Sequence, residues 1–481
     1  MDRYKRLASN TLILALGQFG SKLLVYIMMP LYTGMLGTDG YGAVGIIVNA
    51  SMLIMGVITL SVGESVIRFG LDDKYDKSQV FSIGLITTIT GLIIFIPVVP
   101  SIGLIDFLSS YSILIYLYVF TGSIKSVCAL FVRSTGNVRL FAIDGIFTTI
   151  INISLNLIFL LGFNLGVLGY VLSVVLADLS SIIFLFYMGR LSRYLKLFGI
   201  DKQLRRLMFR FSIPMMPTAI MWWVTNVSGT FFITAMHGLD YTGVYNAAYK
   251  LPNIIALVAG IFSQAWNMSA ITERNSRTIA KFYSDVFNFY QSIIYVVAAT
   301  MMLFINRVLG IMAQGEGFEG AFRYSPPIIL AVVFTCFSTF MGSVYVASKK
   351  SVRSMLTAMT GAAANIIMNF LLIPILGING AALSAMISYV IVFVVRVADT
   401  RSLVFMDLKP VKMIVNLVLL VIMGLIVMFI ENTNLYYITL VALFMLITII
   451  NYRAGVSALQ FFLKKKRGQN FPIKQGQDKQ E

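Results

Sequence analysis

Long apolar segments follow one another along almost the whole chain, separated by short polar or charged turns. A helix needs about 20 apolar residues to cross a bilayer. By this rule the pattern predicts fourteen spans, over residues 9–35, 41–69, 80–102, 111–132, 142–162, 166–189, 211–235, 243–270, 282–306, 323–347, 354–376, 380–398, 411–430 and 435–452. A membrane barrel would show short alternating strands instead. We therefore predict an all-α, polytopic membrane protein.

The first apolar segment could also be read as a secretory signal peptide, because it follows the basic stretch "MDRYKR". The apolar core of a signal peptide is about 7–15 residues long. This segment runs from Ser9 to Met35 and has no small-x-small cleavage signal. We expect it to be retained as the first span.

Composition agrees with this pattern, since 58% of the residues are hydrophobic and 12% are charged. The net charge is +17, which in a soluble protein would suggest a nucleic-acid partner. With both termini inside, 31 of the 37 Lys and Arg residues belong to inner loops and ends, including four at the loop between spans 12 and 13, while the outer loops have two. This bias is the positive-inside rule. One His and two separated Cys leave little for a metal site or a disulfide framework.

Two stretches of the first half return in the second half. "NISLNLIFLLGFNLGVLGYVLS" (152–173) is similar to "NIIMNFLLIPILGINGAALS" (365–384), which has two residues fewer before its second "LG". "LGTDGYGAV" (36–44) is similar to "HGLDYTGVY" (237–245), so that Gly37, Asp39 and Gly42 fall on Gly238, Asp240 and Gly243 at an offset of 201. We interpret spans 1–6 and 7–12 as two parallel copies, in which Gly37, Gly42, Gly238 and Gly243 mark equivalent outer turns.

The predicted organisation follows from this repeat: an N-terminal lobe (1–190), a basic linker (191–210), a C-terminal lobe (211–400), an additional helix pair (401–463) and a polar tail (464–481). Parallel repeats related by an axis along the membrane normal are typical of transporters, with the substrate site between the halves. Spans 13 and 14 could flank a path to the lipid.

The chain resembles the polysaccharide-repeat-unit flippases of O-antigen and capsule pathways, within the multidrug/oligosaccharidyl-lipid/polysaccharide exporter superfamily. The stretches that carry the likeness are "PLYTGMLGTDGYGAVGI" (30–46), "GESVIRFG" (63–70), "FSIPMMPTAIMWWVTNVSGTFFIT" (211–234), "GVYNAAYKLPNIIALVAGIFSQAW" (243–266) and "LGINGAALS" (376–384). The resemblance implies a two-lobed helical bundle whose central cavity opens alternately to each face. It departs at Gly229 and Thr230, where the family often has Asp-Arg.

A polyprenyl-diphosphate oligosaccharide needs cations for its diphosphate, and Lys22 is the first candidate. It lies near the centre of span 1, where a Lys costs about 2.5–3.5 kcal/mol on insertion scales. We predict that it faces a wet cavity or a counter-ion, and Asp178 in span 6 is the best partner candidate. A buried ion pair that only fixes helix packing remains open, as does binding of a coupling proton or Na⁺ by Asp178.

The other charged residues within spans are weaker candidates for the substrate site. Lys125 and Lys250 could contact the substrate or reach the interface by snorkelling. Glu64 and Arg68 share one helix face, either as an intrahelical pair or as an inner gate.

Polar stripes and aromatic residues complete the candidate site. The stripes are Asn152 with Asn156 on span 5 and Asn365 with Asn369 on span 11. Interhelical hydrogen bonding is the usual role of such residues, and a sugar-facing wall would use the same ones. Trp222, Trp223 and Trp266 could stack on sugar rings, and Pro214 and Pro217 should bend span 7.

The alternatives are three other function classes. A lipid II flippase shares the same electrostatic need. A multidrug exporter for cations would need cavity acids, but Asp178 is the lone mid-span acid against Lys22. A membrane glycosyltransferase or polymerase is disfavoured because no D-x-D, nucleophile or Gly-rich phosphate motif appears. We therefore expect a transporter and not an enzyme, without a cofactor apart from a coupling Na⁺ or H⁺.

The setting and partners follow from the resemblance. We expect a bacterial cytoplasmic membrane protein with both termini cytoplasmic. Its partners would be the lipid-linked substrate, membrane lipids, and the polymerase and glycosyltransferases of the same pathway, without nucleic acid.

Overall fold

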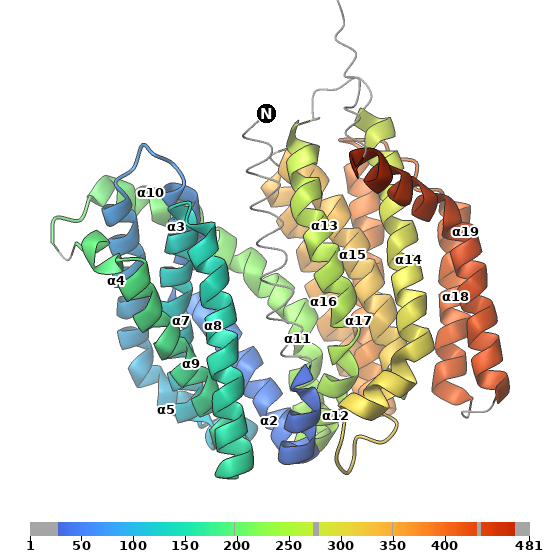
Figure 1. Cartoon of the computed structure of the whole chain (residues 1–481), viewed down its shortest axis with the longest axis horizontal. Helices are drawn as coiled ribbons and strands as arrows, with labels where there is room; N and C mark the ends of the chain where they lie inside the picture. The colour runs from blue at the N-terminus through green and yellow to red at the C-terminus, as the bar shows by residue number, and fades with distance from the viewer. Residues whose placement is uncertain (1–26, 197, 273–278, 349, 431–433, 467–481) are drawn as a thin grey trace, which may run out of the picture.

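The structure, a computed structural model, describes residues 27–196, 198–272, 279–348, 350–430 and 434–466 (Figure 1). Within these ranges the chain forms helices and no strand, so the predicted all-α class is confirmed. The main helices are α2 (Met29–Ile58), α3 (Val62–Gly70), α4 (Lys77–Phe95), α5 (Val99–Ile102), α7 (Ser112–Ser134), α8 (Val138–Asn156), α9 (Gly166–Met188), α10 (Lys202–Ser212), α11 (Met215–His237), α12 (Leu239–Lys250), α13 (Asn253–Thr272), α14 (Ile279–Met312), α15 (Ser325–Ala347), α16 (Ser351–Leu376), α17 (Ile378–Thr400), α18 (Pro410–Phe429) and α19 (Asn434–Lys466).

Twelve helical segments of the described chain are long and apolar enough to cross a membrane. The count of fourteen stays a prediction. The predicted span 9–35 lies mostly outside the described residues, and the predicted span 243–270 is divided into α12 and α13 around Leu251 and Pro252.

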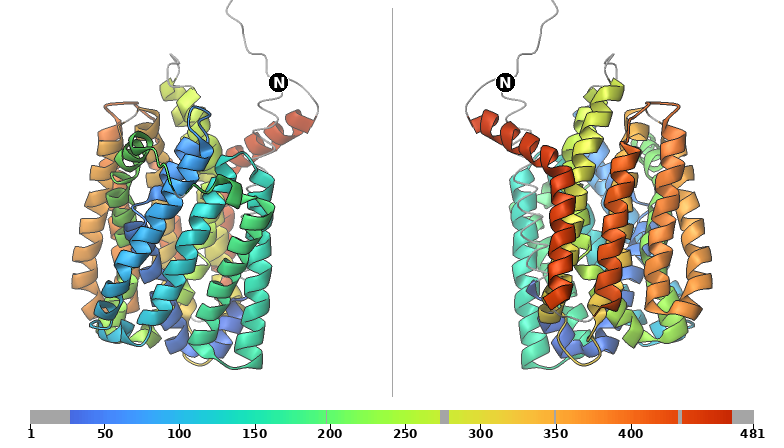
Figure 2. Two further views of the ribbon diagram at one scale, coloured as in Figure 1. Left: turned by 90° about the vertical axis from the view of Figure 1, so that its left-hand side faces the viewer. Right: turned by 90° about the vertical axis from the view of Figure 1, so that its right-hand side faces the viewer.

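The helices form two bundles side by side (Figure 1). The N-terminal bundle consists of α3 to α9, and α10 packs against α3 and α4; the C-terminal bundle consists of α11 to α17. Helix α2 contacts α7 and α9 as well as α12, so it belongs to the boundary between the bundles. Helices α18 and α19 lie side by side on the flank of the C-terminal bundle, where they contact α14 (Figure 2).

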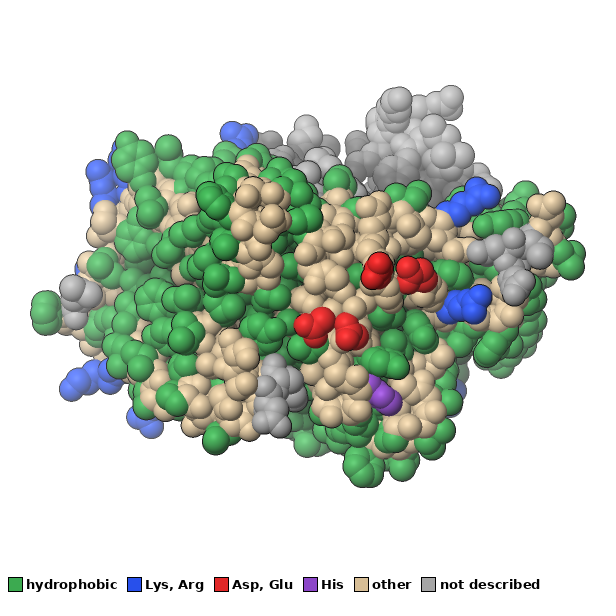
Figure 3. Space-filling view, turned by 90° about the horizontal axis from the view of Figure 1, so that it is seen from below, with side chains coloured by type: hydrophobic (Ala, Val, Ile, Leu, Met, Phe, Trp, Pro, Cys, Tyr) green, Lys and Arg blue, Asp and Glu red, His purple; other side chains and the backbone are tan. Residues whose placement is uncertain are grey.

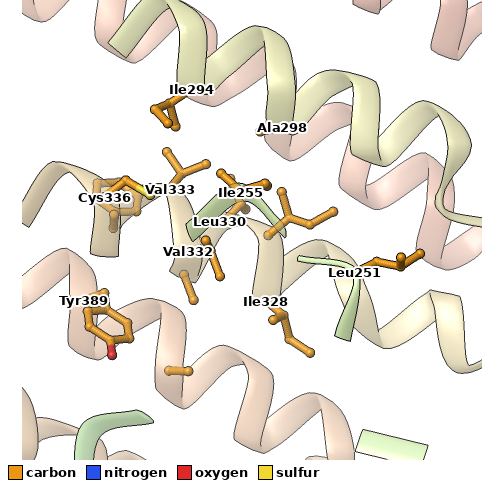
Figure 4. Packing of buried hydrophobic residues seen from close by; sticks show 14 of the residues in the cluster. Leu251, Ile255, Ile294, Ala298, Ile328, Leu330, Val332, Val333, Cys336 and Tyr389 are labelled. Carbon is orange, nitrogen blue, oxygen red and sulfur yellow. The ribbon is translucent and has the colours of Figure 1, made fainter. Parts of the chain in front are cut away.

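Each bundle has its own apolar core. In the C-terminal bundle α15 is the central helix, since 83% of its most apolar stretch of 18 residues is buried inside the molecule. Its side chains, among them Ile328 and Val333, pack between Ile255, Ile294 and Tyr389 of surrounding segments (Figure 4). Two separate clusters fill the N-terminal bundle. Separate cores allow each bundle to move as a rigid body.

The repeated stretches have matching local structure. Asn156 Nδ2 donates to Asn152 Oδ1 over 2.9 Å, and Asn369 Nδ2 donates to Asn365 Oδ1 over 2.8 Å. Gly166 and Gly377, which begin α9 and α17, have φ values of 54° and 55°. The two extra residues of the first copy fall where α8 ends in a π-helical turn, Leu157–Gly162, a form that accommodates insertions in helices. These parallels support the predicted repeat.

Candidate substrate cavity

A cavity of about 1030 Å³ lies between the two bundles. Its wall is built from both sides: Met55, Gly56 and Thr59 of α2 and its end, Gly63, Glu64 and Arg68 of α3, Gly122, Ser123, Ser126, Val127 and Leu130 of α7, Arg210 and Phe211 of α10, Pro214, Met215, Ala219 and Trp222 around α11, and Tyr345 and Ser354 of the C-terminal bundle. The upper parts of the bundles in Figure 1 diverge around it, and we call this the open end.

At the opposite, closed end, α2 and α12 cross at two glycines. A Cβ at Gly42 would lie 2.1 Å from the Leu239 carbonyl oxygen, and a Cβ at Gly243 would lie 2.0 Å from the Thr38 carbonyl oxygen. Both contacts therefore require glycine. Gly42 and Thr38 precede Gly243 and Leu239 by 201 residues, the offset of the repeat, so the crossing has two-fold pseudosymmetry.

The residues Gly37 and Gly238 turn the chain just before this crossing. Gly37 has φ 65° and ψ −173°, and Gly238 has φ 94° and ψ −179°, conformations that only glycine adopts readily. We predicted all four glycines as outer turns. Gly37 and Gly238 do form turns, but Gly42 and Gly243 lie inside helices, at the crossing itself.

Side chains and a loop reinforce the closed end. The Thr38 hydroxyl donates a hydrogen bond to the Asp240 carboxylate, and the backbone N–H of Gln314 donates to the Thr33 hydroxyl over 2.9 Å. The exposed acids of this end include Asp39, Asp240, Glu316 and Glu319. Acidic side chains gather in the middle of this face, and the basic ones lie toward its edge (Figure 3).

The cavity wall contains a broken helix that the sequence did not predict. The predicted continuous span 41–69 is interrupted between α2 and α3, because Leu60 and Ser61 both have φ 51°. Non-glycine residues in this left-handed region cost roughly 1–3 kcal/mol each. Irregular backbone at membrane depth is tolerated where it lines a cavity, and Thr59 and Ser61 do line this one.

The charged side chains of the described residues that line the cavity are Glu64, Arg68 and Arg210. The Arg68 guanidinium carbon lies 4.5 Å from the centroid of the Phe211 ring, and no ion pair with Glu64 occurs between these described residues. Of the two alternatives for Glu64 and Arg68, the intrahelical pair is therefore not formed, and Arg68 makes a cation–π contact with α10 instead. Among the residues that the structure describes, the lining has two cations and one acid.

Lys125 and Asp178 form an ion pair behind the cavity wall. Lys125 Nζ lies 2.7 Å from Asp178 Oδ1, and the two side chains are 27% and 10% exposed. A Cβ at Gly122, a lining residue, would lie 3.7 Å from Asp178 Oδ2. The partner of Asp178 in the structure is thus Lys125. The sequence suggested Lys22 as this partner, and Lys22 lies outside the described residues.

The remaining predicted residues do not line the cavity. Lys250 ends α12 half-buried, close enough to Tyr170 of α9 for an electrostatic interaction between the bundles. Asn369 Nδ2 donates to the Ser228 hydroxyl over 2.9 Å, which joins α16 to α11. The two asparagine stripes thus make hydrogen bonds inside the bundles.

The three tryptophans have different roles. Trp222 lines the cavity. Trp223 Nε1 donates to the Asn49 carbonyl oxygen over 2.9 Å, which joins α11 to α2. Trp266 is 4% exposed and stacks on Phe340 with centroids 4.9 Å apart. The predicted bend in span 7 falls at its start, where Pro214 separates α10 from α11.

One buried cation was missed. The charge count assigns Arg396 to the loop between spans 12 and 13, but the structure places it inside α17 with 2% exposure. The only signal in the sequence is its position within the apolar stretch "VIVFVVRVADT".

An apolar groove of about 700 Å³ lies on the other side of α2. It is lined by Leu53, Ile54, Val57, Ile58, Leu60, Ile86, Thr87, Thr90, Gly91, Ile94, Phe95, Val98, Arg205 and Phe209. Val57 and Ile58 face this groove, while their neighbours Gly56 and Thr59 face the cavity. One short segment therefore separates the cavity, whose lining includes charged side chains, from the apolar groove.

Two bundles of helices that are long and apolar enough to cross a membrane surround a cavity that is closed at one end, an architecture typical of membrane transporters. Residues 7–267, more than half of the chain, match the family model described as polysaccharide biosynthesis protein. The chain belongs to this family of polysaccharide biosynthesis proteins, which agrees with the resemblance predicted from the sequence. No curated protein matches it.

Solved structures share the fold. An outward-facing multidrug resistance MATE family transporter of the MOP superfamily is 18% identical, with a TM-score of 0.58 over 83% of this chain and 95% of that chain. An inward-facing conformation of such a transporter is 16% identical, with a TM-score of 0.58 over 79% and 98%. A MOP superfamily transporter from Pyrococcus furiosus, described as having a binding pocket of reversed polarity, is 15% identical, with a TM-score of 0.57 over 83% of this chain and 95% of that chain. At these identities the likeness concerns the fold.

Proposed function

We propose that the protein is a flippase that moves polyprenyl-diphosphate-linked oligosaccharide repeat units across the bacterial cytoplasmic membrane by alternating access, for surface polysaccharide synthesis. The observation that carries this proposal is the cavity between the bundles, which has two arginines in its lining and Lys125 directly behind it. A diphosphate needs such cations, and a volume of about 1030 Å³ accommodates several sugar rings.

The apolar groove gives the lipid tail a place outside the cavity. With the headgroup in the cavity, the tail would pass the broken segment at Thr59 and lie between α2 and α4. The sequence predicted a path along spans 13 and 14, which correspond to α18 and α19. These helices lie on the flank of the C-terminal bundle, away from this groove (Figure 1), so the proposed path is a different one.

The open end of the cavity would face the cytoplasm. Its rim carries the basic helix α10, whereas the closed face has acids at its centre (Figure 3). This distribution agrees with the positive-inside rule. Both termini would then be cytoplasmic.

A multidrug exporter is the second candidate, because two of the similar structures are multidrug transporters by their titles. Cationic drugs need acids, and Glu64 is the one acid among the lining residues described. A lipid II flippase has the same headgroup chemistry and remains the nearer alternative.

The test is translocation in proteoliposomes, with a fluorescent polyprenyl-diphosphate oligosaccharide and, separately, the cationic dye ethidium. We expect movement of the lipid-linked sugar and none of ethidium. We also expect Lys22→Ala to lose most activity and Lys22→Arg to keep part of it, because the cation remains while its geometry changes. Transport of ethidium alone would reject the flippase. Comparison with lipid II as cargo separates the two lipid-linked substrates.

A further inference from the structure

Arg396 is a buried cation that ties three helices together. Its side chain, on α17, is 2% exposed. Nε donates to the Thr357 hydroxyl over 3.1 Å, Nη1 to the Ser338 carbonyl oxygen over 2.7 Å, and Nη2 to the Ser354 carbonyl oxygen over 3.4 Å. The guanidinium thus contacts α15 and α16 through neutral acceptors.

The charge of Arg396 has no counter-ion in the described part of the chain. No described carboxylate lies within 4.0 Å of its guanidinium, and Asp399, one turn further on, lies 3.6 Å from Arg353. Burying a charge without a partner is costly. Ionisable residues inside membrane spans usually mark a substrate path for this reason.

The guanidinium lies one aromatic layer behind the cavity. Its carbon is 5.3 Å from the Trp222 ring centroid and 5.8 Å from the Tyr345 ring centroid. Trp222, Tyr345 and Ser354 line the cavity. Gly342 makes room for the charge, since a Cβ there would lie 2.8 Å from Nη1.

We propose that Arg396 is the cation of a phosphate subsite in the C-terminal wall of the cavity, which the substrate reaches when the Trp222 side chain moves aside. This inference rests on the proposed function. A guanidinium has five N–H groups, of which three make the bonds above, so it can still donate to phosphate oxygens.

This subsite gives the diphosphate a second anchor. Arg68 and Arg210 lie on the opposite side of the cavity, on α3 and α10. A diphosphate held between these arginines and Arg396 would bridge the two bundles. Substrate binding would thereby be linked to their relative movement, as alternating access requires.

The fluorescence of Trp222 reports on this subsite. The chain has three tryptophans, so Trp223→Phe/Trp266→Phe leaves Trp222 as the single emitter. Geranylgeranyl diphosphate should change its emission, and geranylgeraniol should not. We expect Arg396→Gln to remove this change and to weaken diphosphate binding at least about tenfold, the loss of a charge-assisted contact.

The matched control is Arg353→Gln, at the exposed, ion-paired arginine of α16, which should bind like the parent. If Arg396→Gln does not fold, Arg396→Lys is the deciding variant, because it keeps the charge but lacks the planar guanidinium. Weaker diphosphate binding by Arg396→Lys at an unchanged Tm supports the subsite. Diphosphate binding unchanged in a folded Arg396 variant overturns it and leaves Arg396 as a helix tie. Absence of diphosphate binding by the parent protein in equilibrium dialysis would instead reject the proposed function on which it rests.

Discussion

The pair of Lys125 and Asp178 joins α7 to α9 in the interior of the N-terminal bundle, 2.7 Å apart. Removing one partner of a buried pair leaves an uncompensated charge. We expect Lys125→Met or Asp178→Asn alone to lower the unfolding free energy by about 3 kcal/mol, the lower end of the range for a buried pair, because Lys125 keeps some contact with solvent. The double variant should recover most of this loss. Thermal unfolding in detergent measures the three variants.

Transport by the same variants separates structure from function. A double variant that is stable but inactive would show that the charges serve the substrate or a coupling ion. Full activity of the stable double variant would reduce the pair to a packing element. A single variant as stable as the parent would contradict the buried-pair argument itself.

The depth of a charged residue in the membrane could be predicted from the sequence, whereas its ion-pair partner could not. The apolar runs place Lys125 and Asp178 within spans 4 and 6. They do not give the rotation of either helix about its axis, which decides whether Lys125 or Lys22 reaches Asp178. Arg396 was missed for a related reason, because its position near the end of a span suits an interfacial residue equally well.

At the scale of helices, α2 and α4 define the groove, and two neighbouring residues of α4 test it. Thr90 lines the groove, while Ile89 is 41% exposed and is not part of its lining. Thr90→Trp should fill the groove and slow translocation of a polyprenyl-linked substrate about tenfold, the equivalent of about 1.4 kcal/mol in the barrier. Ile89→Trp introduces the same side chain outside the groove and should have little effect.

The measurement is translocation at matched protein amounts, with polyprenyl and short-chain farnesyl cargo side by side. The defect of Thr90→Trp should be smaller for the short chain, because a shorter tail occupies less of the groove. Equal rates for Thr90→Trp and Ile89→Trp would show that the tail takes another route.

Helix existence was well predicted, and helix continuity was not. Apolar length identifies the spans, since backbone groups in a bilayer must be satisfied within helices. The break at Leu60 and Ser61 has no Pro or Gly at the break itself, and both residues are held in a left-handed conformation by the surrounding fold. A sequence pattern carries no signal for such tertiary strain.

At the scale of the whole molecule, the repeat was the most informative feature of the sequence. The two matched stretches predict equivalent glycines, and the structure brings Gly42 and Gly243 together at the crossing of α2 and α12. Separate cores and a crossing confined to one end describe a molecule that can close at the other end. The sequence does not indicate which of these states is the more stable, because the two states differ in contacts between bundles and not in the helices.

Alternating access requires the crossing of α2 and α12 to separate when the cavity opens to the other side. Thr38 and Asp240 lie on its two helices and are hydrogen-bonded. We expect Thr38→Cys/Asp240→Cys, joined by a short bifunctional thiosulfonate in a background without Cys128 and Cys336, to stop translocation, and a reductant to restore it. Each single cysteine variant treated in the same way is the control, and should remain active. Undiminished transport by the fully cross-linked protein, with cross-linking measured by mass spectrometry, would mean that substrate passes while this end stays closed, and alternating access between these bundles would have to be abandoned.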